Sequence, residues 1–413
     1  MNYKIITAML VLFFVSIYIF SCNDNNMISY SEVSGKIYYD YYPAVNVKVS
    51  NGYNVARTSS DGSFHLSNVT FPYNLTVLDS NNGKVSVFKN LSIDKVDLDM
   101  GNHYNGFNTG YLKVTIPDTL LRSDIEGKLI FTDGEYVNSY VNIYNYTPTL
   151  NVTLPGYMPV TGKIILLSYK INSAGNIVSY ENFGVKNDFT VYPGQENQFT
   201  FTAEDIAMNP GEEMVSGSVN KPPNYTENFS GFNLSFTDKK FTGDTGAEFF
   251  GNANGSPFQF IIPTGISVPF SSIVRKDYYS NDYTSEIFQV YPDSPNVHSI
   301  NVPVVLNSPE NHATNVDNST LFSFSEGSGN GVYEIIITQY NTSISYRIIT
   351  TSTSFKLGDI DQSGFGSIMN LGFVWSVRKI GNYDSMNDYA ANRLEDVNSF
   401  QTYSEQWEFF THP

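Results

Sequence analysis

From residue 28 onward, polar and apolar residues alternate in short runs, and turn-forming residues interrupt these runs every several positions. Successive side chains of a strand point to opposite faces, so this alternation predicts half-buried β-strands. The run VNVKV at 45–49 is one example. The thirty Tyr and thirty Phe favour the same structure, because aromatic side chains suit a pleated surface. The sequence therefore predicts an all-β chain of several sandwiches.

The size and charge of the chain limit what it can be. A length of 413 residues is too great for one ordinary domain, and 41% hydrophobic residues are enough to bury several cores. The formal net charge of −17 repels phosphate backbones and anionic headgroups, which argues against nucleic acid as a partner.

The N-terminus differs from the rest of the chain. Lys4 precedes an apolar run at 5–20, which ends in Ile19-Phe20-Ser21-Cys22. This ending resembles a bacterial lipobox, although Ile19 stands where that pattern prefers Leu. The resemblance implies a signal peptide at 1–21, diacylglycerol on the Cys22 thiol, and a tether at 22–27. Membrane contact would then be through the lipid, in the outer membrane, with the facing leaflet open. A stray thiol at the end of a membrane anchor is the alternative.

A long-period repeat follows. The pentapeptides FTVYP at 189–193 and FQVYP at 288–292, together with Phe88, recur about one hundred residues apart, which is the period of whole domains. Each is followed within about a dozen residues by a further alternating strand. We therefore predict three copies of one sandwich, at 28–108, 109–209 and 210–303, with the middle copy the most diverged.

The first copy resembles the carboxypeptidase regulatory-like domain, a prealbumin-like sandwich. The residues that carry the likeness are VSGKI at 33–37, PAVNV at 43–47 and TSSDGSF at 58–64, and the third copy repeats the opening as VSGSV at 215–219. Because Asp61 and Gly62 suit a tight turn, a hairpin is predicted there. The resemblance implies a non-catalytic module of envelope proteins.

The segment 304–413 resembles a fibronectin type III module. It opens with LNSPEN at 306–311, and Trp375 alternates with Phe373 and Val377 on one strand face. We expect Trp375 to be a core residue, the alternative being an exposed ligand platform. The polar insert at 382–401 contains a predicted short helix near 389–395, and long loops of this kind often carry binding function.

The search for reactive groups finds little. The five histidines, at 65, 103, 298, 312 and 412, have no chelating spacing, and no phosphate-binding loop or nucleophile elbow is present. The weak calcium candidate is Asp359, Asp361 and Ser363, oxygen ligands at alternate positions. Asn370 stands where an EF-hand has its closing acid, so a solvated turn is the simpler interpretation. We predict no enzyme activity, no catalytic residues and no cofactor.

Two functions and one outside alternative follow from these observations. The leading hypothesis is a structural, adhesion or interaction lipoprotein of the cell envelope, with the sandwiches as a stalk and the fibronectin-like module outermost. The second is a glycan-binding surface lipoprotein of a polysaccharide capture system. It is motivated by tyrosine clusters at 38–42, 140–146 and 278–283, since aromatic faces stack on sugar rings. A hydrolase with an unrecognised site is the third.

Overall fold

The all-β prediction is confirmed. The computed structural model describes residues 30–39, 42–100, 107–118, 125–133, 137–155, 159–174, 176–232, 257–264, 268–275, 282–360, 371–392 and 400–412. These residues form strands that assemble into several sandwich-like sheets, with very little helix. Cys22 and the predicted signal peptide lie outside the described residues. Among the helices of the described part, none is long and apolar enough to cross a bilayer.

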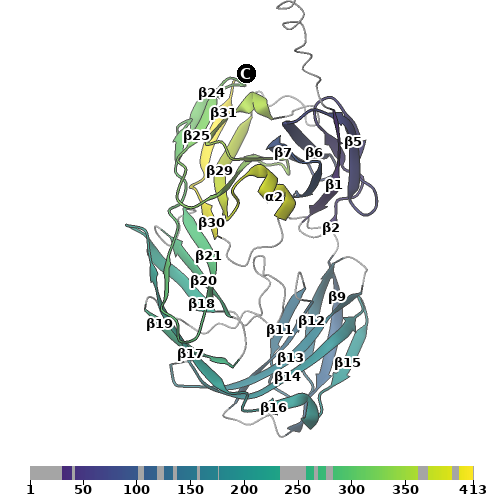
Figure 1. Ribbon diagram of the computed structural model, residues 1–413, viewed down its shortest axis with the longest axis vertical. Coiled ribbons are helices and arrows are strands. Elements are labelled where there is room, and N and C mark those ends of the chain that lie inside the picture. Colours follow the sequence, from purple (N-terminus) through teal and green to yellow (C-terminus); the bar gives the residue numbers. More distant parts are fainter. Residues whose placement is uncertain are drawn as a thin grey trace, which may run out of the picture.

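The strands fall into four groups, which we call modules one to four (Figure 1). Module one contains β1 (Ser31–Tyr39), β2 (Tyr42–Pro43), β3 (Lys48–Ser50), β4 (Val55–Arg57), β5 (Ser63–Val69), β6 (Tyr73–Asp79), β7 (Lys84–Leu91) and β8 (Lys95–Asp99). Module two contains β9 (Phe107–Thr115), β10 (Glu126–Thr132), β11 (Asn138–Asn142), β12 (Thr149–Pro155), β13 (Val160–Ile171), β14 (Ile177–Val191), β15 (Glu196–Thr200), a 3₁₀ turn (Ala203–Asp205) and β16 (Ile206–Met208).

The other two modules complete the chain. Module three contains β17 (Glu212–Asn220), β18 (Thr226–Phe232), β19 (Phe258–Pro263), β20 (Val268–Arg275), β21 (Tyr283–Val290) and β22 (Asn296–Ser299). Module four contains β23 (Leu306–Ser308), β24 (Ala313–Val316), β25 (Leu321–Phe324), β26 (Gly331–Gln339), β27 (Ser345–Thr350), β28 (Ser354–Lys356), a 3₁₀ turn (Leu357–Asp359), β29 (Gly372–Gly381), α2 (Met386–Asn392), β30 (Phe400–Tyr403) and β31 (Trp407–Thr411).

Modules one, two and three share one arrangement of three strands. In each, the opening strand lies between an antiparallel neighbour and a strand near the module's end, which runs parallel to it. The three sets are β5-β1-β8, β12-β9-β15 and β19-β17-β22. The sequence repeat therefore corresponds to a repeated topology.

A glycine in the opening strand makes room for the parallel neighbour. A Cβ on Gly35 would lie 1.8 Å from the carbonyl oxygen of Val96, and a Cβ on Gly217 would lie 2.2 Å from that of Asn296. Since real Cβ atoms do not approach a carbonyl oxygen so closely, only glycine fits at these positions. The repeated Val-Ser-Gly openings thus have a packing explanation.

Modules three, four and one are joined into a single sheet. Its strand order is β18-β20-β21-β30-β29-β26-β27-β7-β6-β3-β4, with β31 and β24 attached beside β29. β21 pairs antiparallel with β30, and β27 pairs parallel with β7. The predicted stalk with module four outermost is therefore wrong, because module four lies beside module one (Figure 1). Edge strands of modules three, four and one thus pair with each other.

The hydrophobic cores also cross between modules. The core of module one includes Val332 and Ile349 of module four, together with Met386, Tyr389 and Ala390 of the α2 region. Leu167, Tyr169 and Tyr180 of module two pack into the core of module three. Burial of apolar surface therefore stabilises the contacts between modules as well as each module.

A buried charge centre lies where modules one and four meet. Glu334 on β26 is 2% exposed and forms ion pairs with Arg347 on β27 and Arg378 on β29. Arg347 also donates to the backbone carbonyl of Asp99 in module one. Burial works to raise the pKa of Glu334, but the two guanidinium groups overcome this effect and hold it below its ordinary value.

Two predictions about module four are confirmed in this structure. The indole of Trp375 is fully buried and packs edge-on against Phe322 in the module core. The predicted short helix in the polar insert is α2, which begins three residues before the predicted start. Its role is packing against module one, since Tyr389 and Ala390 belong to that core.

Candidate ligand-binding pocket

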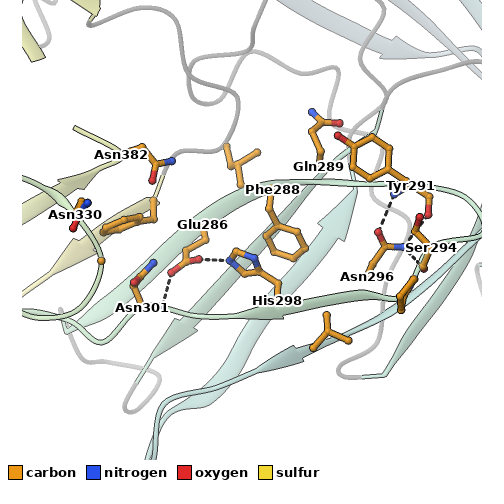
Figure 2. Close-up of a pocket in the computed structure, with 15 residues that line it drawn as sticks. Glu286, Phe288, Gln289, Tyr291, Ser294, Asn296, His298, Asn301, Asn330 and Asn382 are labelled. Carbon is orange, nitrogen blue, oxygen red and sulfur yellow. Dashed lines mark hydrogen bonds and ion pairs between the residues drawn. The ribbon is translucent and has the colours of Figure 1, made fainter. Parts of the chain in front are cut away.

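A pocket of about 670 Å³ opens where β21 and β22 of module three face module four (Figure 2). Pockets of this volume hold small organic ligands. The residues that line it are Glu286, Ile287, Phe288, Gln289, Tyr291, Ser294, Pro295, Asn296, Val297, His298, Asn301, Gly329, Asn330, Asn382 and Phe400.

The middle of the pocket is a stacked pair of rings beside a buried carboxylate. The rings of Phe288 and His298 lie 3.9 Å apart between centroids and nearly parallel, at 12°. His298 Nε2 lies 2.5 Å from Oε2 of Glu286, and the backbone N–H of Asn301 donates to the other carboxylate oxygen. Alternation along β21 explains this placement, because it turns Glu286 and Phe288 to the same buried face.

Module four supplies one end of the pocket. Figure 2 shows Asn330 and Asn382 there, on the side of Glu286 away from Tyr291. The backbone N–H of Asn382 donates to the Asn330 carbonyl, and the Asn330 amide donates to Asp384 at 3.1 Å. Asn382 has a φ of 69°, a conformation that asparagine tolerates better than most residues. Two side-chain amides are thus held next to the Glu286–His298 pair.

A turn of module three forms the other end. Asn296 accepts from the backbone N–H of Tyr291 and donates to the carbonyls of Ser216, Tyr291 and Ser294. These bonds hold the turn that carries Tyr291 at the pocket mouth (Figure 2).

Module two has the same turn. Asn197 accepts from the backbone N–H of Tyr192 and donates to the carbonyls of Tyr111, Tyr192 and Gln195. Tyr192 and Tyr291 are therefore equivalent positions of the repeat, each followed by proline. Tyr291 lines the pocket, whereas Tyr192 is not among its lining residues.

The chemistry of the lining is that of hydrogen bonding. Glu286 and His298 are acid–base groups of the described lining, which contains neither Lys nor Arg. Within the described part of the chain, His298 hydrogen-bonds to Glu286 and to no hydroxyl group. The described lining therefore offers side-chain amides and an imidazole to a ligand, while the Glu286 carboxylate is occupied in holding His298.

The other histidines that the structure describes lie on the surface. His65 is exposed and pairs with Glu32, while His312 lies 3.0 Å from Glu408. His412 follows β31, and His103 lies outside the described residues. The described residues contain no group of three or more metal-binding side chains.

The calcium candidate lies at the edge of what the structure describes. Asp359 accepts from Lys89 of module one at 2.8 Å and from the backbone N–H of Lys356. Asp361 and Ser363 lie outside the described residues. Asp359 thus takes part in the contact between modules one and four.

The tyrosine clusters have different environments. Tyr39 is buried and donates to Asp79, whereas Tyr140, Tyr144 and Tyr146 are exposed on module two. Tyr283 stacks on Tyr403 of module four at 4.2 Å. Tyr41, Tyr278 and Tyr279 lie outside the described residues. Only the middle cluster therefore presents several rings to solvent within the described part of the chain.

The sequence did not reveal the pocket, although some of its lining residues lie in a repeated motif. The repeated pentapeptide at 288–292 contains Phe288, Gln289 and Tyr291, three of the lining residues. It was informative about periodicity alone, because the wall contributed by Asn330 and Asn382 depends on how module four packs.

No protein-family model and no curated protein matches the chain. Among solved structures, a match covers 92% of this chain and 99% of the other, at 12% identity and a TM-score of 0.18. That structure is described as a tetra-tandem repeat in the extending region of a large adhesion protein.

Proposed function

We propose that the protein is a non-enzymatic lipoprotein of the bacterial cell envelope, anchored through acyl chains on Cys22, that acts as a structural, adhesion or interaction module. Modules one to three would be diverged carboxypeptidase regulatory-like sandwiches and module four a fibronectin type III-like sandwich. The shared three-strand arrangement of modules one to three supports the first assignment.

The observation that carries the proposal is the sheet shared by modules three, four and one. β1 begins at Ser31, close in sequence to Cys22, and its module lies beside module four (Figure 1). A lipid tether would therefore hold the molecule at this end, with module two and most of module three farther from the membrane. The shared sheet joins modules three, four and one through backbone hydrogen bonds, which suits a scaffold that presents surfaces to partners.

Anchoring and exposure can be tested with cysteine chemistry. Because Cys22 is the only cysteine and acylation consumes its thiol, an introduced cysteine is the sole target for a thiol reagent. Tyr144→Cys in module two and Tyr53→Cys in module one replace exposed tyrosines. We expect a membrane-impermeant maleimide to label both in intact cells, and envelope partners to copurify with the protein.

The control is Cys22→Ser, which should lose labelled palmitate and leave the membrane fraction. A protein that retains residues 1–21, or that is shielded from the reagent and copurifies with no partner, would contradict the proposal.

Glycan capture is the second candidate, favoured by the exposed Tyr140, Tyr144 and Tyr146 of module two. Aromatic rings with one polar end are suited to stacking on sugars. A glycan array probed with the full chain and with a Tyr144→Ala variant tests this candidate. If the full chain bound none of the sugars on the array, this candidate would be rejected.

A further inference from the structure

We propose that the pocket between modules three and four binds a short neutral saccharide. This inference deepens the glycan-capture candidate by naming a site and a ligand class. It rests on the pocket's lining and is independent of the exposed tyrosines of module two.

The hydrogen-bonding groups of the pocket match sugar hydroxyls. A hydroxyl both donates and accepts, and the amides of Asn330 and Asn382 offer both kinds of partner. Both amides come from module four, whereas Glu286 and His298 come from β21 and β22 of module three.

The acid–base pair is held in place before any ligand arrives. Glu286 is 2% exposed, and its two oxygens are engaged by His298 and by the backbone N–H of Asn301. His298 is thereby fixed against Phe288. A group that is already ordered costs little entropy to use in binding.

Tyr291 supplies an apolar surface at the mouth. Its side chain is 59% exposed, while its backbone is tied down through Asn296. An exposed ring on a fixed backbone can lie against the face of a sugar ring. Together with the Phe288–His298 stack, it gives the pocket the mixed apolar and polar lining typical of small-molecule sites.

Charge selects against acidic sugars. Glu286 is the carboxylate among the described lining residues, none of which is Lys or Arg, and the whole chain has a formal charge of −17. A uronic acid or sulfated sugar would bring a second negative charge beside this buried carboxylate, and none of the described lining residues carries a guanidinium or ammonium group to compensate. The pocket therefore favours neutral hexose or pentose units.

The test is titration of the detergent-solubilised full chain with cellohexaose, maltohexaose, mannohexaose and xylohexaose, with oligogalacturonate as the anionic probe. We expect at least one neutral oligosaccharide to bind and oligogalacturonate not to bind. Tyr291→Ala should lower the association constant by about fivefold or more. Asn382→Asp, which keeps a residue tolerant of positive φ but removes the amide donor, should weaken it as well.

The repeat provides a matched control. Tyr192→Ala removes the equivalent tyrosine of module two, which is 47% exposed and outside the pocket, and should leave the affinity unchanged. Binding that is equally sensitive to both tyrosine variants, or to neither, would overturn the pocket assignment while leaving glycan capture in place. Binding of none of the neutral probes, or preference for oligogalacturonate, would overturn the ligand class.

Discussion

Lys89 Nζ in module one lies 2.8 Å from Asp359 Oδ2 in module four, although 270 positions separate the two residues. The ion pair lies at the contact that the parallel strands β7 and β27 create. It distinguishes a chain folded back on itself from a row of sandwiches, in which modules one and four would be far apart.

The Lys89–Asp359 pair should be captured by a zero-length cross-linker. A carbodiimide joins a carboxylate to an amine already within hydrogen-bonding distance, so we expect mass spectrometry to find peptides containing residues 89 and 359 joined by an amide. Lys89→Arg keeps the positive charge but should abolish this product. Mixing light and heavy isotope-labelled protein separates linkage within one chain from linkage between copies; a product found only between copies would contradict the folded-back arrangement.

Glu334→Gln should destabilise the contact between modules one and four strongly. The variant leaves two arginines without their buried anionic partner, and breaking a buried ion pair in this way costs about 3–5 kcal/mol. Denaturant unfolding followed by tryptophan fluorescence measures the change, because Trp375 and Trp407 are both in module four. Glu310→Gln, an exposed position, is the control and should have little effect. Equal stability of the two variants would argue against the charge centre as a stabilising element.

The pH dependence of stability should depend on the same residue. Because the folded state lowers the pKa of Glu334 below its ordinary 4.5, its contribution is fully present above that value. It is lost as the pH falls through the lower pKa of the folded state. The difference in unfolding free energy between the native chain and Glu334→Gln should therefore shrink as the pH is lowered below 4.5. A difference that stayed constant down to acid pH would assign the effect to packing instead.

Much of the fold could be predicted because it depends on local patterns. Alternation at 45–49 and elsewhere reports which side of a strand is buried, and the repeated pentapeptides report where a module closes. The glycines at 35 and 217 carry the same information about the parallel neighbour. Each of these signals concerns one strand and its nearest partners, which the sequence specifies directly.

The contacts between modules could not be predicted in this way. The pairing of β7 with β27 depends on how whole modules pack, and no local sequence pattern identifies β27 as the partner of β7. Glu334 and Arg347 each interrupt an otherwise largely apolar strand, and opposite charges on buried strands imply mutual pairing. Both strands belong to module four, so even this signal concerns a pairing within one module. The pocket shares this limit, because its two walls come from different modules.

Gly35→Ala and Gly217→Ala should each destabilise their own module by about 1–3 kcal/mol, the usual cost of forcing an extra methyl group into a packed site. The clash is with backbone carbonyls of β8 and β22, and a backbone in a sheet cannot move aside as a side chain can. Gly127→Ala is the matched control: the nearest atom to its Cβ would be Cδ1 of the Ile143 side chain, at 3.1 Å, which can shift by a few tenths of an ångström, so the variant should be tolerated better. Hydrogen exchange resolves the effect by module, with faster exchange expected in β1 and β8 for one variant and in β17 and β22 for the other. If all three variants exchanged like the native chain, close approach of the parallel closing strand would not be what requires glycine in the repeated openings.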